Sequence, residues 1–192
     1  MSLTITHPHL ELIQACKLND RKAQQKLYQL YAQPMFSVCY RIVNQQEEAE
    51  DVLQEAFIRM FRQVESFREE ASFGAWFKRI VVNGSLNHIK QRKRQQDKIE
   101  HLKDESEESI AEEDEPNLPT YSVNQVQGAL ELLPEGYRVV FSLYLFEEYS
   151  HREIAEELGI TESTSKSQLN RAKKKMRELL IQMPYEMSHN NS

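Results

Sequence analysis

The chain has 192 residues, a formal net charge of −6 at pH 7, and only five glycines and six prolines. This length suits one ordinary domain or two small ones, and the scarcity of helix-breaking residues beside many Leu, Glu, Gln and Lys predicts mostly helix. No apolar run approaches the length of a membrane span, and the first residues lack the basic and apolar regions of a signal peptide, so we expect a cytoplasmic protein that does not insert into a membrane.

The charge is divided unevenly along the chain. Residues 1–94 hold 14 Lys and Arg against 10 Asp and Glu, a net +4. Residues 95–123 hold 2 against 10, a net −8, and residues 124–192 hold 8 against 10, a net −2. Because phosphates respond to the local field, a negative total does not exclude a nucleic-acid partner.

Residues 10–94 predict one compact helical domain. The domain opens with a short helix, a break at which Asp20 can serve as an N-cap, and a second apolar helical face that reaches Ile42. Cys16 and Cys39 lie within these apolar patterns and form no Cys-x-x-Cys pair. Buried, reduced thiols are therefore expected rather than a disulfide or a metal site.

An amphipathic helix with an acidic start is predicted over residues 47–64. Its apolar residues follow the i, i+3, i+4, i+7 spacing of one buried face. They are Ala49, Val52, Leu53, Ala56, Phe57, Met60, Phe61 and Val64. The opposite face is polar along its length and carries Asp51, Gln54, Glu55, Arg59 and Arg62.

A second helix is predicted after a short loop, with Ser72 as its N-cap. From Trp76 to Arg94 it has six basic residues and no acid, and aromatic residues including Phe67 and Phe73 crowd its start. Cations hold phosphates and flat rings support unstacked bases, so this stretch suits nucleic acid. The alternative is a helical core with a solvated basic face. Trp76 falls on the apolar face and is expected in the core rather than as a stacking platform.

Residues 95–123 combine ten acids with two prolines and few large apolar side chains. Such a segment cannot bury a core, so we predict a solvated acidic linker. The functional alternative is that its negative charge tracks a basic channel or mimics nucleic acid.

A second helical domain is predicted over residues 124–183, and it contains a helix-turn-helix. Ser150 and Glu153 have the S-x-x-E spacing of a capping box, and Gly159 suits the left-handed position that ends the helix. The next helix carries six basic residues and one acid over residues 162–177, which favours a DNA-recognition helix over a charged surface helix of a bundle. We therefore expect an all-α chain of two small helical domains joined by an acidic linker.

Two stretches resemble one known family. DVLQEAFIRMF followed by SFREEASFGAWFKRIVVN resembles region 2 of an extracytoplasmic-function (ECF) sigma factor, a small member of the sigma-70 family. YSHREIAEELGITESTSKSQLNRAKKKM resembles region 4 of the same family, and the two segments occur in the family's order with no domain between them. The chain departs from the family pattern at Ser165, where valine is usual, and at Gln168, where arginine is frequent.

The resemblance implies that the protein directs core RNA polymerase to promoters through −10 and −35 elements. Region 2 of the family docks on the coiled coil of the polymerase β′ subunit, which requires fixed polar pairs around an apolar centre. The matching polar positions here are Asp51, Gln54, Glu55 and Arg59, with Asp51 and Gln54 foremost.

The DNA contacts implied by the resemblance fall on both domains. The loop from Phe67 to Phe73 is expected to help capture a base flipped from the −10 element, with Lys78, Arg79 and Asn83 contacting backbone or base edges. The −35 contacts are expected at Thr164, Lys166, Ser167, Asn170, Arg171, Lys173 and Lys174. Of these, the two last lysines are expected to neutralise phosphates rather than read bases.

The implied partners are core RNA polymerase, through its β′ and β subunits, promoter DNA, and an anti-sigma factor, which in this family is often membrane-anchored. In the family the linker passes near the polymerase active-site cleft and the RNA exit path. No cofactor or metal is expected, and the protein is not expected to be an enzyme.

Two other classes of protein remain as alternatives. A free-standing helix-turn-helix regulator would explain residues 124–183 but leaves the aromatic and basic stretch at 67–94 without a role. An enzyme is disfavoured because Glu148 and His151 have di-iron spacing without the second motif and the two further Glu that such a site needs. Nucleotide-binding, zinc-protease and hydrolase motifs are also missing from the sequence.

Overall fold

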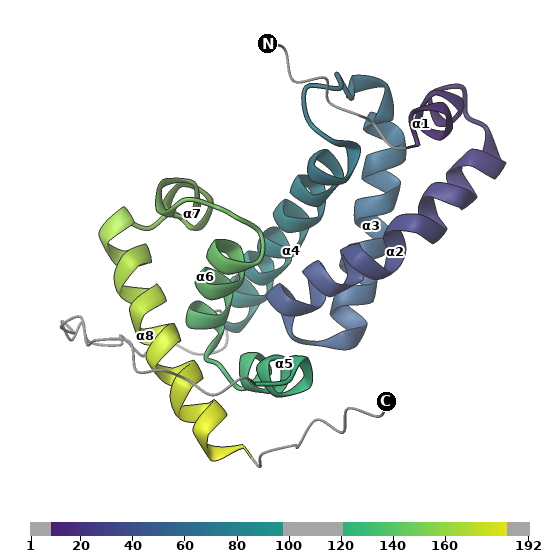
Figure 1. Cartoon of the computed structure of the whole chain (residues 1–192). Helices are drawn as coiled ribbons and strands as arrows, with labels where there is room; N and C mark the ends of the chain where they lie inside the picture. Colours follow the sequence, from purple (N-terminus) through teal and green to yellow (C-terminus); the bar gives the residue numbers. More distant parts are fainter. Residues whose placement is uncertain (1–8, 98–120, 184–192) are drawn as a thin grey trace, which may run out of the picture. The chain divides into compact units, whose positions relative to one another are not determined.

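The computed structural model describes residues 9–97 and 121–183, and every regular element within these two ranges is a helix. The chain divides into two compact units, Met1–His101 and Leu102–Ser192 (Figure 1). The expectation of an all-α chain is confirmed. Most of the predicted acidic linker lies outside the described residues. The helix before it continues to Asp97 and the helix after it starts at Val123, so each reaches slightly into the predicted linker.

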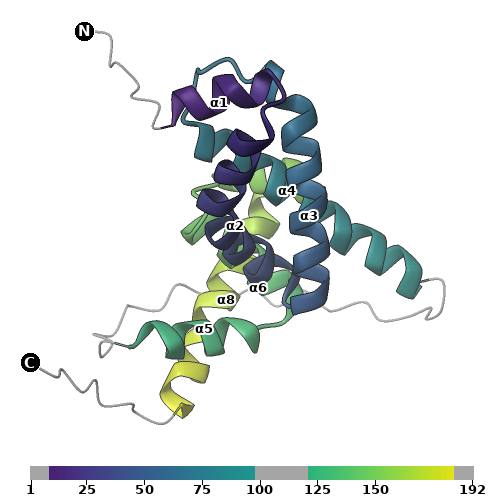
Figure 2. The ribbon, with the colours of Figure 1, turned by 90° about the vertical axis from the view of Figure 1, so that its right-hand side faces the viewer.

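The first unit packs three long helices against one another and adds a short helix and a 3-10 turn (Figure 2). Its elements are α1 (Leu10–Lys17), α2 (Arg21–Val43), α3 (Gln46–Gln63), the turn η1 (Val64–Ser66) and α4 (Phe73–Asp97). The predicted N-cap at Asp20 is confirmed, since its carboxylate accepts hydrogen bonds from the backbone N–H of Lys22 at 2.7 Å and of Ala23 at 3.1 Å. Asn44, with a left-handed φ of 61°, ends α2 and turns the chain into α3.

Large aromatic side chains fill the core of the first unit. Phe73 and Phe77 are fully buried, and the Phe77 ring lies 4.8 Å from that of Phe57, centroid to centroid. Tyr31 packs edge-on against Phe73 at 5.4 Å. Full burial of one such side chain stabilises the fold by about 1.5–3 kcal/mol. The apolar face predicted for α3 is confirmed, except that Phe61 is only half-buried.

Both cysteines are buried in this core as free thiols, as expected. Burial raises the pKa of the Cys39 thiol to about 12. Burial, together with the nearby Asp20 carboxylate, raises the pKa of the Cys16 thiol to about 11. Since the thiolate is the reactive form, neither cysteine is suited to nucleophilic or metal-binding chemistry in the folded unit.

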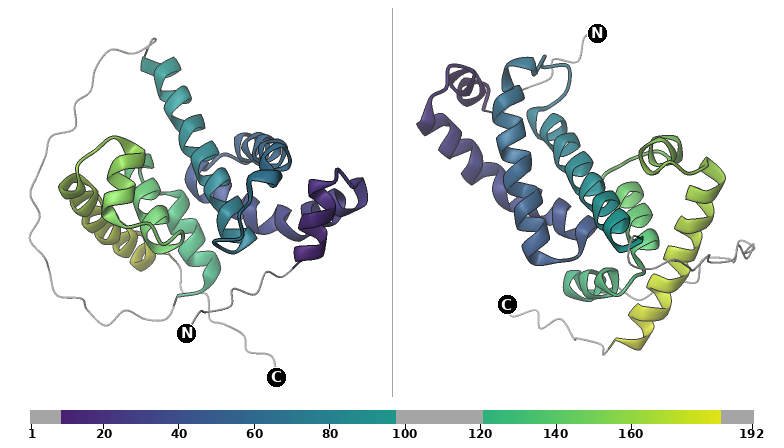
Figure 3. Two further views of the ribbon diagram at one scale, coloured as in Figure 1. Left: turned by 90° about the horizontal axis from the view of Figure 1, so that it is seen from above. Right: turned by 180° about the vertical axis from the view of Figure 1, so that it is seen from behind.

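The second unit is organised around its last helix. Its elements are α5 (Val123–Glu131), α6 (Glu135–Leu145), α7 (His151–Leu158) and α8 (Glu162–Gln182). The long α8 contacts each of the other three helices (Figure 3). Val140 and Leu143 of α6, Ile154 of α7 and Ala172 of α8 are completely buried between them. This small core fixes α7 and α8 as the predicted helix-turn-helix.

In the part of the chain that the structure describes, no helix is both long and apolar enough to span a bilayer.

Candidate protein and nucleic-acid interfaces

The outward face of α3 gathers the residues expected to meet the polymerase. Asp51, Gln54, Glu55 and Arg59 are all exposed, one to two turns apart on the same helix. Within the described ranges, none of the four side chains has a hydrogen bond or ion pair to another residue. They are therefore available to a partner.

Ile58 completes this face and was missed in the sequence. Its side chain is 52% exposed although it is a large apolar residue. It lies four residues after Gln54 and seven after Asp51, which places it on the polar face of α3. An exposed isoleucine among unpaired polar groups gives the face the apolar centre that a helix–helix interface needs. The sequence did contain a signal for Ile58: it does not fall on the i, i+3, i+4 positions of the buried face, so its side chain is expected to be exposed.

The predicted aromatic platform for a flipped base needs correction. Phe67 and Phe73 are only 4% and 1% exposed, and their rings meet edge to face at 5.4 Å. Trp76 is half-buried and packs on both, with ring centroids 5.3 Å and 5.5 Å away. Neither phenylalanine can stack on a base, because both side chains are almost completely buried. Their role is to anchor the two ends of the loop between them.

The loop itself is polar and exposed. Arg68, Glu70, Ala71 and Ser72 are exposed, and Glu69 adopts a left-handed φ of 64°. Ser72 caps α4 as predicted, accepting a hydrogen bond from the Ala75 N–H at 3.2 Å. Beside the start of α4, the first unit therefore exposes the polar backbone and side chains of this loop and not aromatic rings.

The predicted contact residues on α4 are accessible. Arg79 and Asn83 are exposed one turn apart, and Lys78 is half-buried. Asn87, one further turn along, is also exposed and extends the same stripe, although the sequence reading did not single it out. A guanidinium and two carboxamides in a row can bond both phosphate oxygens and base edges.

The basic residue Arg92 of α4 forms an ion pair inside the unit. The Arg92 guanidinium donates to the Glu48 carboxylate at 2.7 Å, and the His88 imidazole meets the same oxygen at 2.9 Å. These contacts join the start of α3 to the basic end of α4. Arg92 therefore serves first to hold the helix in place.

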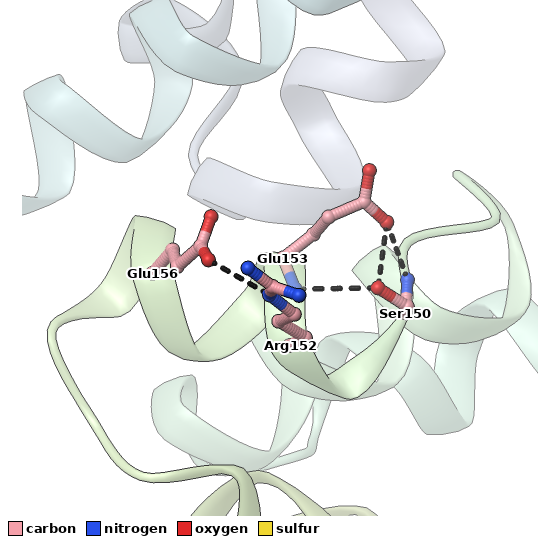
Figure 4. Close-up of polar contacts among 4 residues, drawn as sticks. All are labelled: Ser150, Arg152, Glu153 and Glu156. Carbon is pink, nitrogen blue, oxygen red and sulfur yellow. Dashed lines mark hydrogen bonds and ion pairs between the residues drawn. The ribbon is translucent and has the colours of Figure 1, made fainter.

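The helix-turn-helix is built by local capping. Ser150 and Glu153 form the predicted capping box: the Ser150 hydroxyl accepts from the Glu153 N–H at 3.3 Å, and the Glu153 carboxylate accepts from the Ser150 N–H at 2.9 Å (Figure 4). Gly159 ends α7 with a left-handed φ of 69°, also as predicted. Thr161 then caps α8 by accepting from the Thr164 N–H at 3.0 Å.

The exposed stripe of α8 carries most of the predicted −35 residues. Lys166, Ser167, Asn170, Lys173 and Lys174 are exposed at helical spacing, so they share one face. The side chain of Arg171 is half-buried beside this face. Thr164 is also half-buried, and its hydroxyl is bonded to that of Thr161 at 2.8 Å, so its first role is in the cap.

Behind this stripe lies a polar contact that the sequence did not predict. His151 Nδ1 is 2.9 Å from the hydroxyl of Ser165, which is completely buried, and the Tyr144 ring stacks on the imidazole at 4.6 Å. Burial lowers the pKa of His151, the Lys166 and Lys173 ammonium groups lower it further, and the Glu162 carboxylate partly opposes them. Ser165, which stands where valine is usual in the family, therefore has a polar partner in His151.

No group of three or more His, Cys, Asp or Glu side chains suited to a metal ion occurs among the described residues.

The two interfaces lie in segments that match known families. Residues 27–95 match the family model of sigma-70 region 2, and residues 124–176 match that of sigma-70 region 4. The chain is thus a protein of the sigma-70 class.

Curated relatives define the family more narrowly. The chain is 30% identical over 178 residues to the ECF RNA polymerase sigma factor SigW of Bacillus subtilis, covering 88% of this chain and 94% of that one. It is 27% identical over 171 residues to the RNA polymerase sigma-H factor of Pseudomonas aeruginosa, covering 85% and 89%. The chain belongs to the ECF sigma factor family.

A solved structure agrees at the level of the fold. The sigma factor RpoE of Bartonella quintana, crystallised in complex with the anti-sigma factor NepR, aligns with a TM-score of 0.53 and 20% identity. The alignment covers 83% of this chain and 98% of that one.

Proposed function

We propose that this chain binds core RNA polymerase and directs promoter-specific initiation by recognising −10 and −35 elements. The observation that carries the proposal is the order of its surfaces: an unpaired polar face on α3 in the region 2 segment and a basic stripe on α8 in the region 4 segment. Each surface has the exposure and the chemistry that its role requires. The phosphoryl chemistry belongs to the polymerase, so the chain itself acts as a cytoplasmic specificity factor and not as an enzyme.

The α3 face is the proposed docking site for the β′ coiled coil. Asp51 and Gln54 supply polar contacts one turn apart, Glu55 and Arg59 flank them, and Ile58 supplies the apolar centre. Buried apolar area at the middle with polar groups around it is the usual arrangement of a protein interface. The β subunit is the proposed second contact, made by the second unit.

The loop after Phe67 and the exposed stripe of α4 are proposed to hold the −10 strand. Flipping one base costs a few kcal/mol, which contacts to the extruded base must offset. The loop, with its exposed polar groups, provides those contacts, while Arg79 and Asn83 bind the adjoining backbone or base edges. The rings of Phe67 and Phe73 support the loop from within the core.

The α8 stripe is proposed to enter the major groove at the −35 element. Asn170 can bond an adenine edge bidentately, and Lys166 can reach a guanine. Lys173 and Lys174, further along the helix, are placed to neutralise phosphates. The relative from Bartonella quintana was crystallised with an anti-sigma factor, which supports the proposal that an anti-sigma factor also controls this chain.

Competition for core polymerase tests the proposal. Wild type and the double variant Asp51→Ala with Gln54→Ala are measured against a housekeeping sigma factor. A matched control is Glu11→Ala with Gln14→Ala, which removes an exposed acid and glutamine at the same spacing from α1. We expect tight binding by the wild type and the control, and weakening by more than about tenfold in the α3 variant. Failure of the folded wild type to bind would favour the free-standing regulator.

A further inference from the structure

The short helix α1 reaches the start of the exposed loop through one side chain. Lys17, the last residue of α1, donates a hydrogen bond from its ammonium group to the backbone carbonyl of Phe67 at 3.1 Å. The same nitrogen lies 5.9 Å from the centroid of the Phe67 ring. Lys17 is half-buried, and the contact joins residues 50 positions apart in the sequence.

The carbonyl that Lys17 holds is at the point where regular structure ends. The Phe67 N–H closes η1 by bonding to the Val64 carbonyl at 3.2 Å, and the backbone of Phe67 then becomes extended. Two residues later Glu69 turns through the left-handed region, and the chain rejoins a helix only at the Ser72 cap. The direction in which residues 68–72 leave the core is therefore set at Phe67.

Two different forces act on Phe67. Its ring is locked into the aromatic cluster with Phe73 and Trp76, which fixes the side chain. The ring alone leaves the peptide plane free to rotate, whereas a charge-assisted hydrogen bond to the carbonyl fixes that plane. Lys17 therefore restrains the orientation of the Phe67 peptide plane, which packing of the ring in the core does not restrain.

We propose that Lys17 is a positioning residue that sets the loop of residues 68–72 for capture of the flipped −10 base. The inference rests on the proposed function of this loop and goes beyond it, because α1 precedes the segment, residues 27–95, that matches region 2. Lys17 acts through the Phe67 carbonyl and not by touching the base. Binding energy at the loop depends on this preorganisation, since a loop that must first be ordered loses affinity.

The test uses full-length Lys17→Met in holoenzyme with core polymerase, on a promoter selected by the wild-type holoenzyme. Three quantities are measured: affinity for core polymerase, affinity for the −35 duplex, and affinity for a forked −10 DNA with either a normal or an abasic nucleotide at the flipped position. Lys22→Met is the control, since Lys22 is an exposed lysine at the start of α2 without this contact. Lys17→Arg keeps a cationic donor.

We expect Lys17→Met to keep core and −35 affinities within about twofold while its forked-DNA affinity falls by about tenfold. Replacing the normal nucleotide with the abasic one should then lower the forked-DNA affinity of Lys17→Met much less than it lowers that of the wild type. General destabilisation of the protein would not produce this difference. Lys17→Arg should restore most of the loss. If Lys17→Met does not fold, Lys17→Gln, which replaces the ammonium group with a shorter neutral side chain, carries the same test. Equal abasic penalties in Lys17→Met, Lys22→Met and wild type would overturn the inference. Absence of any abasic penalty in the wild type would instead refute base capture by the loop, and the inference with it.

Discussion

The two units hold their candidate contacts by different means. In the first unit, the loop and α4 rest on an aromatic cluster centred on Phe73, and the Lys17 ammonium group from α1 bonds the Phe67 carbonyl just before the loop. In the second unit, α8 rests on a small aliphatic core and on local hydrogen bonds at Ser150, Thr161 and Ser165. Damage to the aromatic core should therefore abolish binding by the loop and α4. Single substitutions in the second unit should each weaken binding by α8 by a smaller amount.

The largest expected effect is in the aromatic cluster. Phe73→Ala removes a fully buried ring and should lower the free energy of unfolding of the first unit by about 3–5 kcal/mol. Trp76 is the only tryptophan in the sequence, so its fluorescence during denaturant unfolding reports on this unit. Ile58→Ala, at an exposed site, should change stability by no more than about 0.5 kcal/mol. Similar stabilities for the two variants would contradict the core assignment of Phe73.

On α8, base contacts and phosphate contacts should be separable. Asn170→Ala should cost about 1–3 kcal/mol of binding to the preferred −35 duplex and relax specificity at one position. Lys173→Ala should weaken all duplexes alike and reduce the salt slope by about one. Holoenzyme binding to duplexes with single base changes, at several salt concentrations, measures both. The assignment of roles fails if Lys173→Ala changes the base preference.

Removing a local cap should cost less. Ser150→Ala loses the capping box of α7 and should destabilise the second unit by about 1 kcal/mol. Ser163→Ala, an exposed serine in the first turn of α8, is the matched control and should have almost no effect. Thermal unfolding followed by circular dichroism at the helix band distinguishes them. Equal stabilities would mean that the cap is not needed for this helix.

The smallest effect concerns pH. Burial and the Lys166 and Lys173 ammonium groups lower the pKa of His151, with the Glu162 carboxylate opposing them, and the Tyr144 ring stacks on the imidazole. Since the unfolded chain then binds the proton more readily, stability is unaffected well above the ordinary pKa of about 6.5 and falls as the pH drops through it. His151→Gln, which keeps a partner for Ser165, should show a shallower loss than wild type between about pH 7.5 and 5. Identical pH profiles would exclude this contribution.

Most of the fold could be predicted because its signals are local. The Asp20 and Ser72 caps, the Ser150–Glu153 box and the Gly159 turn each depend on residues within one helical turn, and all are present. The buried stripe of α3 follows from helical periodicity alone.

The features that were missed depend on tertiary contacts. Phe67 and Phe73 flank a loop, where periodicity cannot tell a core ring from an exposed one, and only the packing with Trp76 decides it. The Lys17–Phe67 contact joins distant segments, and a lysine at a helix end has many possible partners. The His151–Ser165 bond pairs two ordinary surface residue types across the turn between two helices.

The most direct test of the account is transcription from genomic DNA by core polymerase with and without this chain, with the start sites sequenced. We predict a discrete set of transcription start sites that requires the chain and is lost with Asp51→Ala plus Gln54→Ala. Asn170→Ala should change which start sites are used without weakening binding to core polymerase. If the wild-type chain leaves the start sites of core polymerase unchanged, the assignment of a core-binding face to α3 and a promoter-reading face to α8 is contradicted.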